Sequence, residues 1–331
     1  MWCAFAGLST RSMAAIILLC VTLSAWPAWA GTLKVGVIKF GTVSWELDVI
    51  KNHGLDEAEG VTLDILELAS KNATSVALQA GEVDIIVTDW IWVSRQRAEG
   101  ATFTFIPYSH AVGAVMVPAG SQVRTIEDLK GKRLGIAGGP LDKSWLLLRG
   151  LARERYAMDL DRDVEKVFAA PPLLNEEILA GRLDAVLNFW HFAARLEAAG
   201  FGRVIEIAEV TRDLGIERPV PLIGYVFDES LAAGRREDVT AFVRATRRAK
   251  AILADSDAEW DRLRPLMKAP DDATFRALRD RHRQGIPIRW GAEERADAEQ
   301  LFNLLAKVGG AKLVGRATII QDGTFWPDLN Y

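Results

Sequence analysis

The chain has 331 residues and a net charge of −4 at pH 7, from 40 Lys and Arg against 44 Asp and Glu. An acidic chain without a dense basic stripe argues against nucleic acid as a partner. Cys3 and Cys20 are its two cysteines and both lie in the first thirty residues, so the rest of the chain has neither a disulfide nor a cysteine-based metal site.

The first thirty residues predict a secretory signal peptide. Arg11 precedes an apolar stretch from Met13 to Ala25, and Pro27 and the ending Ala28-Trp29-Ala30 follow it. This stretch is shorter than the ~20 apolar residues that a membrane span requires, which disfavours an uncleaved anchor. We therefore expect residues 1–30 to be removed before Gly31 and the product to be periplasmic.

The first half of the remaining chain alternates strands with helices. Strands are predicted over 33–41, 61–68 and 83–87, where β-branched residues are frequent. Helical spacing is found over 44–57, from a cap at Ser70 or Asn72 through Ala80, and over 90–99. This alternation predicts parallel β-α-β units.

The second half repeats that order. Its predicted strands cover 132–139, 164–169 and 183–188, and its helices cover 142–155, a segment from about 174, and a segment that ends near Gly200. Residues one hundred positions apart match, among them Ser44 with Ser144, Trp45 with Trp145, and Trp90 with Trp190. Helix-end glycines recur by chance, but repeated tryptophans at one offset favour two domains that are built alike.

Two apolar, β-rich segments, 103–121 and 218–230, lie between and after the repeated units. If both are extended, they cross between the domains as a two-strand hinge, and the helices from Arg236 onward pack on the first domain. The predicted fold is α/β with two lobes, each a mostly parallel sheet flanked by helices. Residues 31–111 with 223–331 form lobe 1, and residues 112–222 form lobe 2.

Catalytic and metal-binding motifs are missing from the sequence. It contains no G-x-S-x-G, H-E-x-x-H or Walker A pattern, and Gly135, Gly138 and Gly139 do not form G-x-G-x-x-G. The four histidines, among them His110 and His191, lack the spacing of metal ligands. We predict no metal, no cofactor and no enzymatic activity.

A ligand site is predicted where the strands of both lobes end. In parallel α/β sheets, ligands bind beyond the carboxyl ends of the strands, and two such edges facing across a hinge form a cleft. Helix N-termini near Ser44 and Ser144 suit a negative or strongly polar group. The predicted ligand-binding residues are Lys39, Ser44, Trp45, Glu46, Ser70, Asn72, Thr88, Asp89, Trp90, Trp92, Gly139, Asp142, Ser144, Trp145, Asn188, Trp190 and His191.

Several of these residues have a structural alternative. Ser44 and Ser144 would serve as N-caps without any ligand, and the tryptophans would serve equally well to pack helices against the sheets. Lys39 and Asp89 would form a salt bridge across the strand ends.

Five segments resemble the periplasmic solute-binding proteins of ABC importers, in the branch that serves nitrate, sulfonates, taurine and thiamine-precursor pyrimidines. They are "LKVGVIKF", "ALQAGEVDIIVTD", "RTIEDLKGKRLGIAGG", "EILAGRLDAVLNF" and "REDVTAFVRATRRA", and they span most of residues 33–255. The most specific part is "IEDLKGKRLGI", a short helix that leads into a strand.

The resemblance implies a type II periplasmic binding fold, capture of a small polar solute in the cleft by a monomer, and delivery to a membrane permease and its ATPase. Glu46, Asp89 and Asp142 depart from the basic or neutral donors that a sulfonate or nitrate binder would present. A zwitterion, a pyrimidine-like heterocycle or a metal chelate fits equally well. An enzyme or a sensor on the same scaffold is the alternative, because fold does not determine function.

Overall fold

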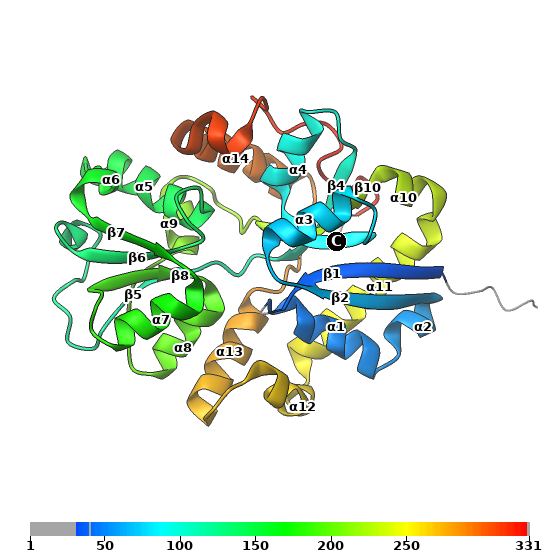
Figure 1. Ribbon diagram of the computed structural model, residues 1–331, viewed down its shortest axis with the longest axis horizontal. Helices are drawn as coiled ribbons and strands as arrows, with labels where there is room; N and C mark the ends of the chain where they lie inside the picture. Colours follow the sequence, from blue (N-terminus) through cyan, green and yellow to red (C-terminus); the bar gives the residue numbers. More distant parts are fainter. Residues whose placement is uncertain (1–30, 40, 330–331) are drawn as a thin grey trace, which may run out of the picture.

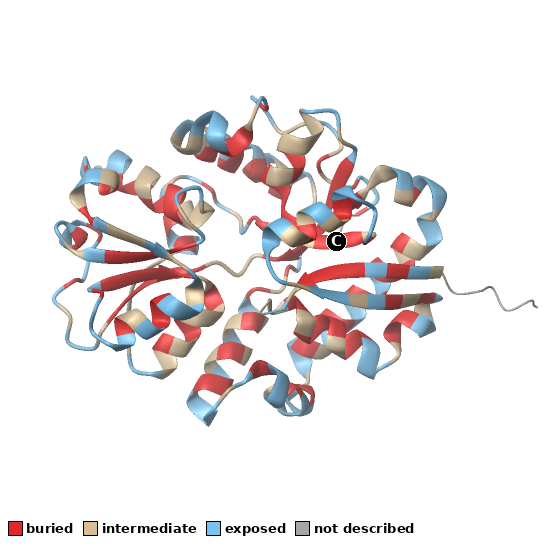
Figure 2. Cartoon of the chain, viewed as in Figure 1, coloured by how far each residue is buried: buried red, intermediate tan, exposed pale blue. Residues whose placement is uncertain are grey.

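The computed structural model describes residues 31–39 and 41–329, so the predicted signal peptide lies outside the described residues. Figure 1 shows two lobes side by side, each with helices on both faces of a sheet. Figure 2 shows that buried residues concentrate in the inner strands of both sheets. Within the described ranges, no helix combines the length and apolar character needed to cross a bilayer.

The first lobe is built on a five-stranded sheet with the order β2-β1-β3-β10-β4. Its strands are β1 (Gly31–Ile38), β2 (Val61–Leu68), β3 (Ile85–Asp89), β4 (Phe103–Ser109) and β10 (Ile223–Asp228). Strands β2, β1 and β3 are parallel, whereas β10 is antiparallel to both of its neighbours.

The helices of this lobe largely follow the apolar periodicity of the sequence. They are α1 (Val43–Asn52), α2 (Leu55–Glu59), α3 (Lys71–Gln79), α4 (Trp90–Arg97), α10 (Glu229–Gly234), α11 (Arg236–Asp255) and α12 (Asp257–Met267). The single helix expected over 44–57 is in fact two, because Gly54 between them adopts the left-handed conformation, with φ of 59°. Ser70 caps α3 as expected, since its hydroxyl accepts a hydrogen bond from the backbone N–H of Ala73.

The second lobe is built on a five-stranded sheet with the order β7-β6-β8-β5-β9. Its strands are β5 (Ala114–Val117), β6 (Arg133–Ala137), β7 (Glu165–Ala169), β8 (Ala185–Asn188) and β9 (Gly202–Glu206). Its helices are the short 3-10 helix η1 (Glu127–Leu129), α5 (Lys143–Tyr156), α6 (Leu160–Asp163), α7 (Pro171–Leu179), α8 (Trp190–Ala198) and α9 (Ile207–Asp213).

The two sheets have the same topology, which confirms the predicted duplication. Strands β1, β2, β3 and β4 correspond in order to β6, β7, β8 and β9, and β10 corresponds to β5. In each sheet, the antiparallel strand is the one that the chain reaches after crossing from the other lobe. The crossings are residues 110–113, before β5, and residues 214–222, before β10.

The last two long helices contact both lobes, which differs from the expectation that they pack on the first lobe alone. Helix α13 (Asp272–Gln284) packs against α8, and α14 (Ala292–Val314) packs against both α4 and α5. The buried side chains of Leu301, Phe302 and Leu305 on α14 share one apolar cluster with Trp145 of α5. Helix α14 takes this position because its apolar face is wide enough to contact α4 and α5 together.

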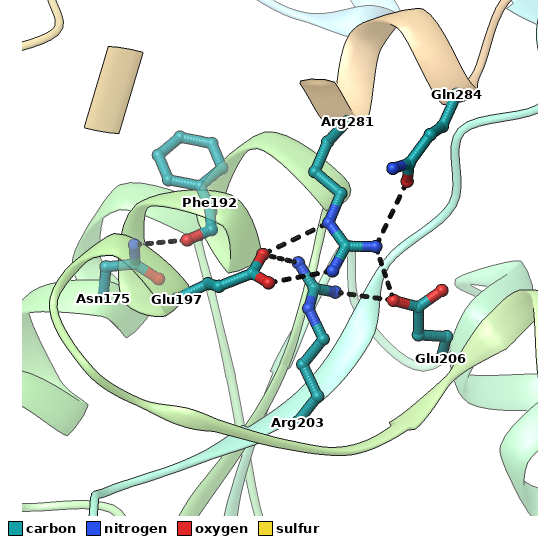
Figure 3. A network of polar contacts seen from close by, with 7 residues as sticks. All are labelled: Asn175, Phe192, Glu197, Arg203, Glu206, Arg281 and Gln284. Atoms are coloured by element: carbon teal, nitrogen blue, oxygen red, sulfur yellow. Dashed lines mark hydrogen bonds and ion pairs between the residues drawn. The ribbon is translucent and has the colours of Figure 1, made fainter. Parts of the chain in front are cut away.

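Charged side chains add to the contact between α13 and the second lobe (Figure 3). Arg281 of α13 donates to both carboxylate oxygens of Glu197 on α8, at 2.9 and 3.2 Å, and to Glu206 at 2.7 Å. Arg203 of β9 also donates to Glu197, at 2.7 Å. We call these four residues the seam cluster, because they join the lobes along the α8–α13 contact.

Candidate functional site

A cavity of about 280 Å³ is lined by residues of both lobes and of the two crossings. Four helices direct their N-terminal ends to it: α1 and α4 of the first lobe, and α5 and α8 of the second. Each of these helices follows the carboxyl end of a parallel strand, namely β1, β3, β6 or β8. This is the location that the β-α-β reading of the sequence predicts for a ligand site.

Aspartate side chains cap two of the four helix ends. Asp89 accepts a hydrogen bond from the backbone N–H of Trp92 at the start of α4, at 2.9 Å. Asp142 accepts hydrogen bonds from the N–H groups of Ser144 and Trp145 at the start of α5. The N-cap positions therefore belong to Thr42 in α1 and Asp142 in α5, and the expectation that Ser44 and Ser144 are N-caps is wrong.

The other two helix ends have no side-chain cap. The N-cap of α1 is Thr42 and that of α8 is Phe189, and neither makes a side-chain capping hydrogen bond. Thr42 and Val43, and Phe189 to His191, line the cavity. First-turn N–H groups without a side-chain partner, together with the positive end of the helix dipole, suit an oxygen-rich or negative group. The sequence did not single out α8 for this role because phenylalanine is not a recognisable cap.

A cluster of charges on the cavity wall connects the two lobes. The Asp89 carboxylate accepts from the ammonium groups of Lys71 at 2.5 Å and of Lys143 at 2.8 Å, both on the same oxygen. Lys71 lies at the rim, with 46% of its side chain exposed, whereas Asp89 is 6% and Lys143 19% exposed. Since Lys143 begins α5 and Asp89 ends β3, this ion pair spans the lobes.

Two opposite effects set the pKa values in this cluster: burial disfavours the charged forms, and the oppositely charged neighbours favour them. Burial alone would raise the pKa of the Asp89 carboxyl, but the two lysines outweigh it and hold that pKa well below its usual range. Burial lowers the pKa of Lys143, and the attraction of Asp89 opposes this. Burial raises the pKa of Asp142, and Lys143 opposes this in turn. Asp89 is thus an anion with two cationic partners, and the predicted pair of Lys39 with Asp89 is replaced by this cluster.

Six of the predicted ligand-binding residues lie together around the cavity. They are Thr88, Asp89, Asp142, Ser144, Trp190 and His191. Burial lowers the pKa of His191 to about 3, so its imidazole is neutral near physiological pH. Among the described residues, neither the Thr88 hydroxyl nor Nδ1 of His191 has a hydrogen-bond partner. Nowhere in the described ranges do three or more His, Cys, Asp or Glu side chains gather as a metal site would require.

Glu46 lies away from the cavity lining, inside the first lobe. Its carboxylate oxygens accept from the ammonium group of Lys250 on α11 at 2.6 and 2.7 Å, and from the hydroxyl of Tyr225 on β10 at 2.8 Å. Burial raises the pKa of Glu46, and Lys250 opposes that rise. The side chain is fully buried, so this acid holds helices α1 and α11 to the sheet.

Of the four tryptophans matched between the lobes, Trp190 lines the cavity. Trp90 and Trp145 are completely buried, and the indole N–H of Trp90 donates to the carbonyl of Pro221. Trp45 is buried behind Trp190, with the rings edge to face at 6.0 Å between centroids. Trp92 stacks on Phe103 in the first lobe.

The remaining predicted residues also lie outside the lining. Ser44 donates to the Gly41 carbonyl, and Ser70 and Asn72 lie at the start of α3. Asn188 is buried, where its amide donates to Asn175 and to the carbonyl of Pro171. The two others are at turns: Lys39 follows β1, and Gly139 has φ of 87° before α5.

Residues that the sequence did not assign to the site also line the cavity. Lys71 stands between the predicted Ser70 and Asn72, and Lys143 stands between the predicted Asp142 and Ser144, so a lysine flanked by two predicted site residues was the available signal. Tyr108, Leu222 and Ile223 belong to the crossing strands or the segments beside them. The rule that ligands bind at parallel strand ends does not point to these residues.

Two α/β lobes of the same topology, joined by two crossings and enclosing a cavity, define the type II periplasmic binding fold. The chain belongs to the NMT1/THI5-like family, whose sequence model matches residues 49–259. A search of curated protein sequences finds no match.

Solved structures support the same fold. The periplasmic aliphatic sulphonate binding protein SsuA from Escherichia coli matches with a TM-score of 0.71 and 18% identity, over 89% of this chain and 92% of that one. The alkanesulfonate-binding protein SsuA from Xanthomonas axonopodis pv. citri, bound to MOPS, matches with a TM-score of 0.67 and 18% identity, over 89% and 98%. The desulfurization enzyme DSZB matches with a TM-score of 0.60 and 16% identity, over 84% and 92%. Binding proteins and an enzyme thus share this architecture.

Proposed function

We propose that this protein is the substrate-binding component of an ABC importer. It captures a small polar solute between its lobes in the periplasm, as a monomer released by cleavage before Gly31, and delivers that solute to an inner-membrane permease and its ATPase. Its lobes comprise residues 31–111 with 223–331, and residues 112–222. Membership of the NMT1/THI5-like family and the likeness to sulfonate-binding proteins support this proposal.

The observation that carries the proposal is a cavity to which both lobes contribute helix N-termini. A solute there touches both lobes only while they are together, so its binding favours the closed arrangement. The direct contact of Lys143 with Asp89 is consistent with closure at this place. A surface site on one lobe would have no such link to the relative position of the lobes.

We assign solute contact to the predicted residues around the cavity and to the two lysines beside them. The uncapped starts of α1 and α8 donate N–H groups to a polar part of the solute, and Trp190 provides an apolar wall. Sulfonates, taurine, nitrate, pyrimidine precursors of thiamine and metal chelates are the candidate solutes.

Isothermal titration of the exported protein against this panel tests the proposal. We expect one class to bind with a stoichiometry near one and to reduce the radius measured by X-ray scattering. A Lys130→Gln variant, altered at an exposed position of the second lobe, serves as control and should bind equally. Absence of heat and of thermal stabilisation with every compound, together with an unchanged radius, would contradict the proposal. Mass spectrometry of the protein as purified from the periplasm would identify a retained solute.

An enzyme on this scaffold is the second candidate, because DSZB shares the fold and His191 lines the cavity. A histidine with a pKa of about 3 is a weak base near neutral pH, which disfavours this candidate. Turnover of a panel compound that is lost in His191→Ala, while binding is kept, would favour the enzyme.

A further inference from the structure

The charges on the cavity wall balance. Among the described residues that line it, the charged side chains are Lys71, Asp89, Asp142 and Lys143, two of each sign. His191 adds no charge, since burial keeps its imidazole neutral. The next charges behind the wall, Glu46 and Lys250, pair with each other, and the Lys250 ammonium lies 5.0 Å from the centre of the Tyr108 ring.

The balance is local as well as total. The least exposed charges, Asp89 and Lys143, are in direct contact, at 2.8 Å. Lys71 reaches the same Asp89 oxygen from the rim. Asp142 is fixed at the start of α5 by two backbone N–H groups and is attracted to both lysines. Asp89 and the two lysines are therefore paired directly, and Asp142 is bonded to backbone N–H groups within the attraction of the same lysines.

We propose that the cavity selects solutes of zero net charge and that Asp89 determines this selectivity. The inference rests on the proposed function. A charged solute leaves its hydration on entering a largely apolar cavity, and the uncapped starts of α1 and α8 offer an anion only partial positive charge. To obtain a full countercharge, an anion must compete with Asp89 for the lysines, and a cation must compete with the lysines for Asp89. An uncharged solute meets no such competition.

The uncharged solute is a hydrogen-bonding molecule with a compact apolar body. Each lysine ammonium has three N–H donors and gives one to Asp89. Val87, Phe189 and Ile223 add apolar wall to the same cavity. An amide or a nitrogen heterocycle satisfies both requirements.

Three probes of one planar shape and different charge test the inference: benzamide, benzoate and benzamidinium. Titration calorimetry at pH 7 and low salt should show that benzamide binds wild-type protein at least ~10-fold more tightly than either ion, the ratio that corresponds to ~1.4 kcal/mol. Asp89→Asn, which keeps the cap on α4, removes one negative charge and should make benzoate the tightest of the three. Lys143→Gln removes one positive charge and should make benzamidinium the tightest. Lys130→Gln, outside the cavity, should keep the wild-type order.

The opposite shifts separate charge selection from damage to the fold, because a loosened cavity would weaken all three probes alike. If the two variants move the preference in the same direction or leave it unchanged, the inference is wrong. If Asp89→Asn fails to fold, the shift of Lys143→Gln toward the cation decides alone. An anionic sulfonate that binds wild-type protein more tightly than every uncharged compound would overturn the inference and leave the proposed function intact. If neither these probes nor the solute panel binds, both are wrong.

Discussion

Glu46 and Asp89 are both buried carboxylates that a lysine holds, but their partners come from different parts of the molecule. Lys250 and Tyr225, which hold Glu46, belong to the same lobe as Glu46 itself. Asp89 shares its oxygen between Lys71 of its own lobe and Lys143 of the other. The first cluster depends only on the folding of one lobe, whereas the second also depends on how the lobes meet.

The origin of the partners distinguishes Glu46, whose charge is structural, from Asp89, whose charge is functional. Burial does not make this distinction. Both acids are nearly inaccessible to water, so burial alone would rank them together. Rigid partners within one lobe favour fixed geometry, and a partner on the opposite lobe gives a contact that a solute competes with or reinforces. We therefore expect changes around Glu46 to affect unfolding and changes around Asp89 to affect solute binding.

Among the charge variants, the largest expected effect is that of Lys250→Met. It leaves Glu46 buried without its cation, and the free energy of unfolding should fall by ~3–5 kcal/mol in urea denaturation. Lys143→Met should cost less than Lys250→Met, because Asp89 keeps the ammonium group of Lys71 as a partner. Equal losses in the two variants would remove the distinction between the clusters. The double variant Glu46→Gln/Lys250→Met should recover part of the loss.

Acid should destabilise the protein through the partly buried His191 and the buried His282. Burial lowers the pKa of both His191 and His282 to about 3, from an ordinary value of 6.5. Between these values the unfolded chain binds protons that the folded chain does not, so stability falls as the pH drops from 6.5 toward 3. Each histidine contributes a slope of up to ~1.4 kcal/mol per pH unit. Denaturation of His282→Phe at several pH values should show a flatter fall than wild type, and an identical profile would contradict this pKa.

Trp190 and Trp90 allow the same comparison, between a residue of the cavity and a residue of the core, with uncharged side chains. Trp190→Ala should weaken solute binding by ~1–3 kcal/mol, because its ring lines the cavity. Trp90→Ala should instead lower the free energy of unfolding by ~3–5 kcal/mol, because its ring is fully buried and its N–H is bonded to Pro221. Calorimetry and denaturation on both variants check the assignment. A Trp190→Ala protein that binds with full affinity would assign that ring to packing.

The sequence was sufficient to predict where strands end but not where side chains point. Apolar periodicity located β3 and β6, so Asp89 at the end of β3 and Asp142 beyond β6 were found from position alone. Glu46, one turn into α1, faces Lys250, which is 204 residues away in sequence. No local sequence pattern predicts a contact between residues so far apart in the chain. Likewise Tyr108 and Ile223 reach the cavity only because the crossings run beside it, which depends on how the two lobes are placed.

The smallest expected effect is at the seam cluster, where charges also join the lobes but lie nearer to water. The side chains of Arg281, Glu197 and Glu206 are 24%, 36% and 32% exposed. Arg281→Ala should therefore lower the free energy of unfolding by about 1 kcal/mol or less at low salt. The difference from wild type should shrink in 1 M salt, because salt screens exposed pairs more than buried ones.

Arg182→Ala is the matched control for this variant, since Arg182 forms a two-hydrogen-bond pair with Glu177 within the second lobe alone. If Arg281 only stabilises the fold, both variants should leave solute affinity unchanged. If the seam cluster also holds the lobes at the spacing that closes the cavity, Arg281→Ala alone should change affinity, and high salt should reproduce that change in wild-type protein. The contact of Asp89 with Lys143 would then share control of closure with a second set of charges outside the cavity.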